Sequence, residues 1–136
     1  MIYVDANYWI YWFDERLPEH RFVREAMRAA IREGIVMNVI TVLEIAHYLR
    51  LLPEHEFRKR MDYLMRLSTL TLIPLDVDLL NTALGMLIKY ARLGIGSRDS
   101  VILATMEKAG VNRILTHDKT FRKIEWLEVV DVIPQE

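Results

Sequence analysis

Apolar positions along the chain follow two different spacings. Short, mainly apolar runs, often with β-branched residues, occur at 2–4, 36–38, 70–73, 113–115 and 129–132. Such runs are typical of buried strands. Between them, apolar residues recur three and four positions apart, which is the spacing of one face of a helix. The pattern predicts about five strands that alternate with helices.

Local signals predict where the helices begin and end. The helix predicted at 19–33 is followed by Gly34 as a C-cap. A helix that begins at Thr41 is expected to stop before Pro53, because proline cannot continue a helix. Asn7 is expected to cap the first helix. The other predicted helices cover residues 7–13, 57–67, 76–93 and 97–109.

This alternation predicts an α/β fold with a mostly parallel sheet, since parallel neighbours need helical crossovers. The chain has 136 residues and no internal repeat, so residues 1–136 are expected to form a single domain. No uncharged run is long enough to cross a bilayer, and no membrane partner is expected. The absence of cysteine excludes thiolate metal sites and agrees with a cytoplasmic location.

Two acidic residues directly follow predicted strands. Asp5 is the only charged residue between Met1 and Phe13, and Asp118 lies just beyond the strand at 113–115. In parallel α/β sheets, the loops after the carboxyl ends of the strands form the ligand crevice. If these two strands are neighbours, Asp5 and Asp118 will be close together. A helix N-cap is an equally good explanation for Asp5 taken alone.

Two further acids lie in predicted helices, each within an apolar stretch. Glu44 is the only formally charged residue from Ile35 to Tyr48. Asp99 lies in the first turn of a helix and precedes an apolar run. Glu44 has a simpler explanation as the solvent face of its helix, and an acid in a first turn complements the helix dipole. Only the combination of all four acids points to chemistry.

Together, the four carboxylates predict a divalent metal site. Crowded carboxylates repel one another, and a bound cation relieves that repulsion. Oxygen ligands favour one or two Mg²⁺ or Mn²⁺ ions, which suit phosphodiester hydrolysis because they activate water and stabilise the leaving oxygen. The net charge of -1 argues against a generally basic nucleic-acid binder, so RNA contacts are expected to be local.

Four segments resemble the motifs of the PIN-domain nucleases, and within that family the VapC toxins of VapBC toxin–antitoxin systems. These segments are residues 2–7, 41–45, 97–104 and 114–121. The resemblance implies a three-layer α/β/α fold, a Mg²⁺ or Mn²⁺ site formed by the four acids, and cleavage of single-stranded or structured RNA. It also implies a homodimer and an antitoxin partner. Ser97 departs from the pattern, because some members have a further acid there.

Other polar residues near the acids are candidate members of the site. Asn7 and Thr116 are expected to be auxiliary residues. Possible RNA contacts are Arg98, His117, Lys119 and Arg122. Solvated surface positions explain the same charges without any RNA.

Two other functions are compatible with these residues, and a third is disfavoured by one of them. A housekeeping RNA-processing nuclease of the same family would have the same acids. A catalytically idle module that binds RNA or protein would keep them for folding alone. A phosphatase of the haloacid-dehalogenase-like kind, with Asp5 as its nucleophile, needs a second Asp two positions on, where this chain has Asn7.

Overall fold

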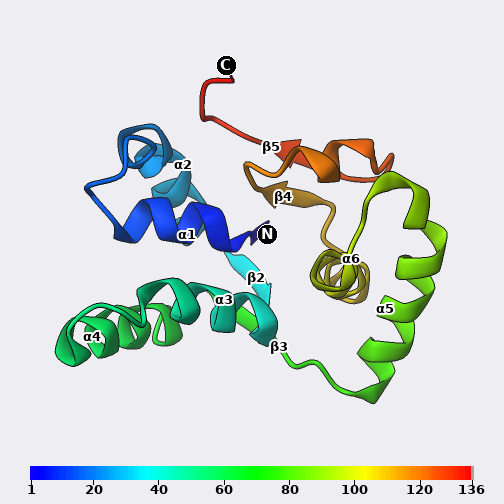
Figure 1. Ribbon diagram of the computed structural model, residues 1–136, viewed down its shortest axis with the longest axis horizontal. Coiled ribbons are helices and arrows are strands. Elements are labelled where there is room, and N and C mark those ends of the chain that lie inside the picture. The colour runs from blue at the N-terminus through cyan, green and yellow to red at the C-terminus, as the bar shows by residue number, and fades with distance from the viewer. Residues whose placement is uncertain (136) are drawn as a thin grey trace.

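A five-stranded parallel sheet forms the centre of the computed structural model, which describes residues 1–135 (Figure 1). Its strands are β1 (Ile2–Val4), β2 (Ile35–Asn38), β3 (Leu70–Ile73), β4 (Arg113–Leu115) and β5 (Glu128–Val130). They lie in the order β3-β2-β1-β4-β5, and every neighbouring pair is parallel. Val4 lies opposite Leu115, so the strands that precede Asp5 and Asp118 are neighbours.

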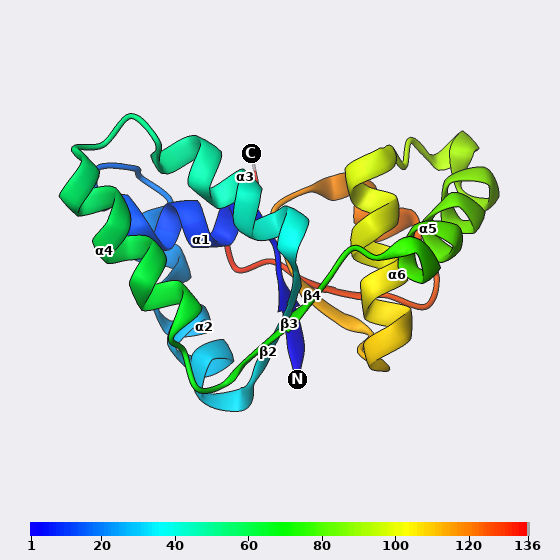
Figure 2. The same ribbon diagram turned by 90° about the horizontal axis from the view of Figure 1, so that it is seen from below.

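Helices cover both faces of this sheet (Figure 2). The first four lie on one side and the last two on the other: α1 (Ala6–Phe13), α2 (His20–Glu33), α3 (Val39–Leu49), α4 (Glu54–Met65), α5 (Val77–Lys89) and α6 (Ser97–Ala109). Two short 3-10 helices, η1 (Ala91–Leu93) and η2 (Lys119–Lys123), complete the described chain. The predicted three-layer α/β/α fold is confirmed. Within residues 1–135, no helix is long and apolar enough to cross a membrane.

The helices that leave the carboxyl ends of β1 and β2 begin differently from the prediction. The Asp5 carboxylate caps α1 by accepting the N–H of Ala6, so the expectation that Asn7 caps this helix is wrong. In α3, the Asn38 side chain accepts the N–H of Ile40, and the helix starts earlier than predicted. Both caps are the last polar groups before a helix, and each shortens the loop between strand and helix.

The other boundaries shift by smaller amounts. Helix α4 begins directly after Pro53, whereas the apolar spacing predicted 57–67. The predicted helix at 76–93 is divided: α5 ends at Lys89, and the chain tightens into η1. Gly94 follows η1 with a φ of 83°, a left-handed conformation that glycine adopts without strain. These shifts lie away from the edge of the sheet where the acids were predicted.

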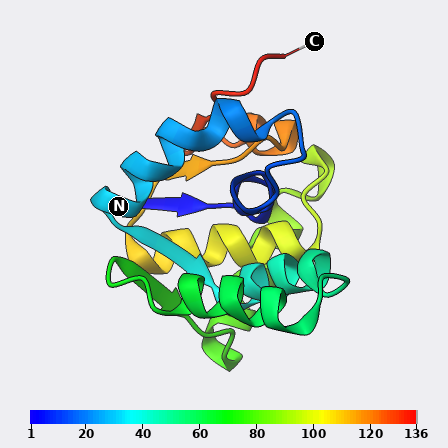
Figure 3. The same ribbon diagram turned by 90° about the vertical axis from the view of Figure 1, so that its left-hand side faces the viewer.

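The hydrophobic core lies between the sheet and its two helical layers. The three residues of β1 are buried, and β1 passes directly into α1 (Figure 3, blue). Tyr8 and Trp9 of α1 have no exposed surface, so these aromatic side chains contribute to the core. A second apolar cluster joins α5 to α6 through Leu79, Ala83, Val101 and Ala104. Both α1 and α6 are therefore fixed rigidly against their neighbours.

A buried polar network links the ends of β1 and β2 to helices on both faces. The Tyr3 hydroxyl lies 2.6 Å from Thr41 Oγ1 and accepts the N–H of Asn38 at 3.1 Å. Asn38 Nδ2 in turn donates to Thr105 Oγ1 at 3.0 Å, across the sheet in α6. Burial raises the pKa of Tyr3, so its hydroxyl stays protonated. The network holds α3 and α6 in fixed positions relative to each other.

We expect Tyr3→Phe to lower the free energy of unfolding by about 1–3 kcal/mol, because it leaves the buried N–H of Asn38 and the hydroxyl of Thr41 short of a partner. Urea denaturation measures this change. Tyr63→Phe is the matched control, because Tyr63 is 43% exposed, and it should change stability by less than about 0.5 kcal/mol. Equal stabilities for the two variants would contradict a structural role for this hydroxyl.

Candidate active site

Four acidic side chains from four elements meet at the carboxyl edge of the sheet. Asp5 ends β1, and Asp118 follows β4. Glu44 lies in the middle of α3, and Asp99 lies in the first turn of α6. Because β1 and β4 are neighbours and the buried network fixes α3 against α6, the fold itself brings these positions together.

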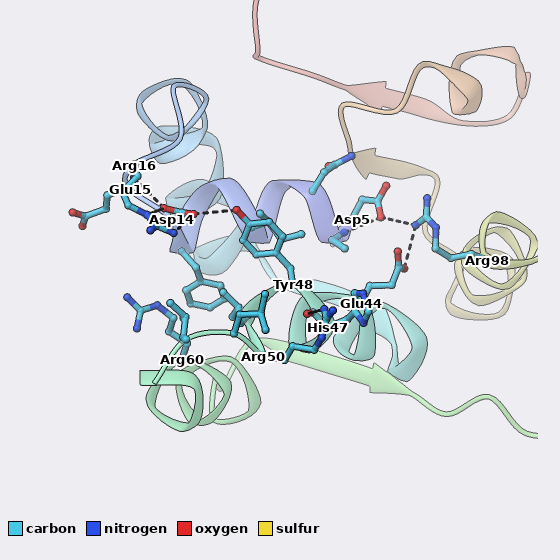
Figure 4. Close-up of a pocket in the computed structure, with 17 residues that line it drawn as sticks. Asp5, Asp14, Glu15, Arg16, Glu44, His47, Tyr48, Arg50, Arg60 and Arg98 are labelled. Carbon is cyan, nitrogen blue, oxygen red and sulfur yellow. Dashed lines mark hydrogen bonds and ion pairs between the residues drawn. The ribbon is translucent and has the colours of Figure 1, made fainter. Parts of the chain in front are cut away.

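The guanidinium group of Arg98 contacts all four carboxylates. Its Nη1 lies 3.1 Å from Asp5 Oδ1 and 3.2 Å from Glu44 Oε1 (Figure 4). Its Nη2 lies 2.9 Å from Asp99 Oδ1 and 3.7 Å from Asp118 Oδ2. The sequence had suggested Arg98 only as a possible RNA contact. Its place beside Asp99 in a helix's first turn was the one signal of this internal role.

The auxiliary residues predicted from the sequence also lie here. The Thr116 hydroxyl donates to Asp5 Oδ2 at 2.7 Å and accepts the N–H of Asp118 at 3.1 Å. Asn7 Nδ2 donates to the same hydroxyl at 3.4 Å, and Asn7 Oδ1 accepts the N–H of His117. Thr116 thus links the acids that follow β1 and β4 and orients the Asp5 carboxylate.

The positive charge at this site does not fully compensate the negative charges of the acids. Burial raises the pKa of Glu44 and of Asp99, despite the neighbouring positive charge of Arg98. Burial alone lowers the pKa of Arg98, but the charges of Asp5, Glu44 and Asp99 outweigh it and raise that pKa, so the guanidinium stays charged. One cation therefore faces four carboxyl groups, and part of their repulsion remains.

The donor set fits a divalent cation in its chemistry. Asp99 Oδ1 is buried and forms no hydrogen bond of acceptable geometry within residues 1–135, although Arg98 Nη2 is close to it. Such an oxygen is a ready ligand for Mg²⁺ or Mn²⁺. In the described part of the chain, however, no three histidine or acidic side chains are arranged to hold a metal ion together. The Arg98 guanidinium occupies the space that the four acids share.

Two of the predicted RNA-contacting residues are held by an acid that the sequence analysis missed. Asp131 Oδ2 lies 2.7 Å from His117 Nδ1 and 3.4 Å from Arg122 Nη2, and Tyr8 donates to its other oxygen. Burial alone raises the pKa of Asp131, but the hydrogen bonds from Tyr8 and His117 outweigh it and lower that pKa. Asp131 directly follows β5, just as Asp118 follows β4. The sequence analysis did not recognise it as an acid at the end of a strand, because it placed the last strand at 129–132. Lys119 is exposed.

A groove of about 1080 Å³ extends from the acids along α1 and α3 (Figure 4). At its far end, Asp14 accepts hydrogen bonds from Arg16 Nε at 2.9 Å and from the Tyr48 hydroxyl at 3.0 Å. The hydrogen bond from Arg16 is the main reason that the pKa of Asp14 falls to about 2. Arg50, Arg60 and Glu15 line the same end, so this part of the groove contains three arginines and two acids.

A comparison with family models identifies the family of this chain. A family model described as the PIN domain matches residues 2–127. The chain belongs to the PIN domain family. PIN domains are nucleases, and the predicted resemblance to them is confirmed. No curated protein sequence matches the chain significantly.

Solved structures with this fold include toxins and toxin–antitoxin complexes. VapC20 of Mycobacterium tuberculosis, described as a Sarcin-Ricin loop cleaving toxin, is 16% identical with a TM-score of 0.75, over 90% of this chain and 94% of that one. VapBC2 of Rickettsia felis, bound to a promoter DNA fragment, is 15% identical with a TM-score of 0.73, over 96% of this chain and 98% of that one. FitAB bound to DNA is 22% identical with a TM-score of 0.75, over 100% of this chain and 98% of that one. At these identities the likeness shows the fold alone.

The low pKa of Asp14 predicts a measurable acid dependence. A carboxylate whose pKa is lower in the folded chain stabilises it above pH about 4, the unfolded pKa, and this contribution is lost as the pH falls toward 2. Arg16 is 82% exposed and its attraction is screened, so we expect about 1 kcal/mol. Asp14→Asn should remove this part of the decline in urea denaturation between pH 4 and 2.

Asp62→Asn, on the exposed side of α4, serves as the control and should keep the wild-type profile. If Asp14→Asn declines as steeply as the wild type does, the Arg16 and Tyr48 contacts do not stabilise the folded chain.

Proposed function

We propose that this PIN domain, expected to span residues 1–136, is a metal-dependent endoribonuclease and the toxin of a VapBC-type pair. The observation that supports it most is the meeting of Asp5, Glu44, Asp99 and Asp118 at one guanidinium. Asp5 and Asp118 also cap helices, but neither cap requires four carboxylates to lie together, and carboxylates repel one another. The family adds nuclease chemistry to this geometry.

In this proposal the four carboxylates hold one or two Mg²⁺ or Mn²⁺ ions. Bound there, the ions supply Lewis acidity toward a phosphodiester and lower the barrier to attack by water. Thr116 keeps the Asp5 carboxylate oriented through its hydrogen bond. Glu44 is 32% exposed and lines the groove, and in this proposal it would accept a proton from the attacking water. Exposed Lys119 is available to contact RNA phosphates beside the acids.

His117 and Arg122 complete the proposed RNA-binding surface next to Asp118. Asp131 holds both side chains, which lowers the entropy that they lose when RNA binds. Single-stranded RNA suits such a site, because its backbone can enter a groove that a duplex cannot. Cytoplasmic RNA is the proposed substrate.

An antitoxin is the proposed inhibitor of this nuclease. The structures with the same fold include VapBC and FitAB complexes, in which the toxin is paired with its antitoxin. In this proposal, a segment of such a protein lies in the groove that begins at Asp5 and Glu44 and ends among Arg16, Arg50 and Arg60. A segment seated there would cover the acids and exclude RNA.

We expect Glu44→Gln to lower the rate of RNA cleavage about a hundredfold or more, because one carboxylate of the site loses its charge. Glu44 caps no helix in the structure, so the variant should keep its fold, which circular dichroism checks. The assay follows single-stranded RNA with Mg²⁺ or Mn²⁺, and EDTA should abolish cleavage. Glu125→Gln, at an exposed position, is the matched control and should cleave like the wild type.

Two results would point to other functions. Absence of cleavage with either metal on any RNA would favour an idle binding module. Cleavage without growth inhibition on expression, and no neighbouring antitoxin gene, would favour a housekeeping nuclease.

A second copy of this chain is the proposed partner in a homodimer. One face of α5 carries four exposed apolar side chains at helical spacing: Val77, Leu80, Leu84 and Ile88. A contiguous stripe of this kind is typical of an interface. We expect Leu84→Glu to convert a dimer to a monomer in analytical ultracentrifugation. Leu51→Glu, which introduces the same charge at an exposed leucine between α3 and α4, should leave the dimer intact.

A further inference from the structure

Arg98 is placed as a cation of the acid cluster rather than as a surface residue. Its two terminal nitrogens divide the four carboxylates between them, two to each nitrogen. The side chain is 33% exposed, so its guanidinium points into the protein while one side remains open to solvent. Its backbone lies in the first turn of α6, beside one of the acids that it contacts.

We propose that Arg98 is a built-in competitor of the divalent cation, so that the acids are neutralised either by the arginine or by metal. This inference rests on the proposed function, because it assumes that the four acids are the metal ligands. In the arginine form the site is folded and inactive. In the metal form the guanidinium has left the carboxylates.

Two observations support exchange rather than a permanent ion pair. First, the oxygens that the proposed metal would need are engaged by the arginine: Asp5 Oδ1, Glu44 Oε1 and Asp99 Oδ1 all face the guanidinium. Among residues 1–135, no three acids are arranged to hold a metal in this form of the site. Second, the arginine satisfies the acids incompletely. Asp99 Oδ1 stays without a well-formed hydrogen bond, and a single positive charge faces four carboxyl groups. A divalent ion offers more charge at the same place.

The exchange needs little movement of the backbone. Arginine has a long side chain with many rotamers, and its exposed side gives it a path to solvent. Helix α6 is fixed by its apolar contacts with α5 and by the Asn38–Thr105 hydrogen bond, so Asp99 stays in place when its neighbour leaves. Arg98 therefore differs from the four acids: its departure empties the site without dismantling it.

The test is the affinity of the metal-free protein for Mn²⁺, measured by isothermal titration calorimetry on the wild type, Arg98→Met and Arg98→Lys. Arg98→Met removes the competitor, and we expect Mn²⁺ to bind at least about tenfold more tightly. Arg98→Lys keeps one charge but cannot reach four carboxylates at once, so its affinity should lie between the other two. A residue with a purely structural role would give the opposite result, because loosening the site weakens metal binding.

Thermal unfolding gives a second readout. In EDTA, Arg98→Met should unfold at a lower temperature than the wild type, because the acids repel one another without a counter-ion. Saturating Mn²⁺ should restore its stability, and the increase in melting temperature should exceed that of the wild type. Arg24→Met removes the same charge from an exposed position on α2, and it should match the wild type in both measurements.

Equal or weaker Mn²⁺ binding by Arg98→Met would overturn the inference. If that variant does not fold in EDTA, Arg98→Lys decides, and equal or weaker binding by it overturns the inference too. RNA cleavage is scored separately. If the variants bind Mn²⁺ more tightly but the wild type cleaves no RNA, the inference about Arg98 stands and the proposed nuclease is overturned. If the wild type cleaves RNA but the variants bind Mn²⁺ as the wild type does, the nuclease stands and the inference is overturned.

Discussion

Repulsion between four carboxylates is the constraint that the rest of this structure accommodates. Asp5 and Asp99 are buried, and Glu44 is partly so, which makes their charges costly without a cation. In the structure, Arg98 supplies that cation from the same helix turn as Asp99. Its single positive charge offsets only part of the repulsion, so the charge of the site favours a divalent cation. In the exchange proposed above, Arg98 neutralises the acids in the metal-free fold and leaves them when a metal ion binds.

The order of the strands explains why the acids meet. A parallel sheet in the order β3-β2-β1-β4-β5 brings the ends of β1 and β4 together, although more than a hundred positions separate Asp5 from Asp118. Helices α3 and α6 lie on opposite faces, and the Tyr3–Asn38–Thr105 hydrogen bonds connect them through the sheet. The site is therefore a property of the sheet's edge, which rigid elements support from both faces.

The approximate strand positions and the layer arrangement could be predicted from the sequence, because they depend on local spacing. The four acids that we propose as metal ligands could be singled out, because each follows a strand or stands within an apolar stretch. Contacts between residues far apart in the sequence could not be predicted in this way. The one local signal for Arg98 is its place beside Asp99 in the first turn of α6, and its other contacts are with acids from three other elements. Asp131 was missed because an error in the end of β5 placed it inside a strand. Asp5 was treated as either a helix cap or a site residue, and it is positioned for both.

That double duty of Asp5 has an evolutionary consequence. One oxygen of its carboxylate serves both the first peptide group of α1 and Arg98, and the other receives Thr116. A descendant that had lost its chemistry would still be selected to retain an acid or amide there, merely to start that helix. Glu44 caps no helix, so an inactive descendant would lose this acid before it lost Asp5. Among relatives of this chain, the residue at the position of Glu44 should therefore distinguish active from inactive proteins better than the residue at the position of Asp5.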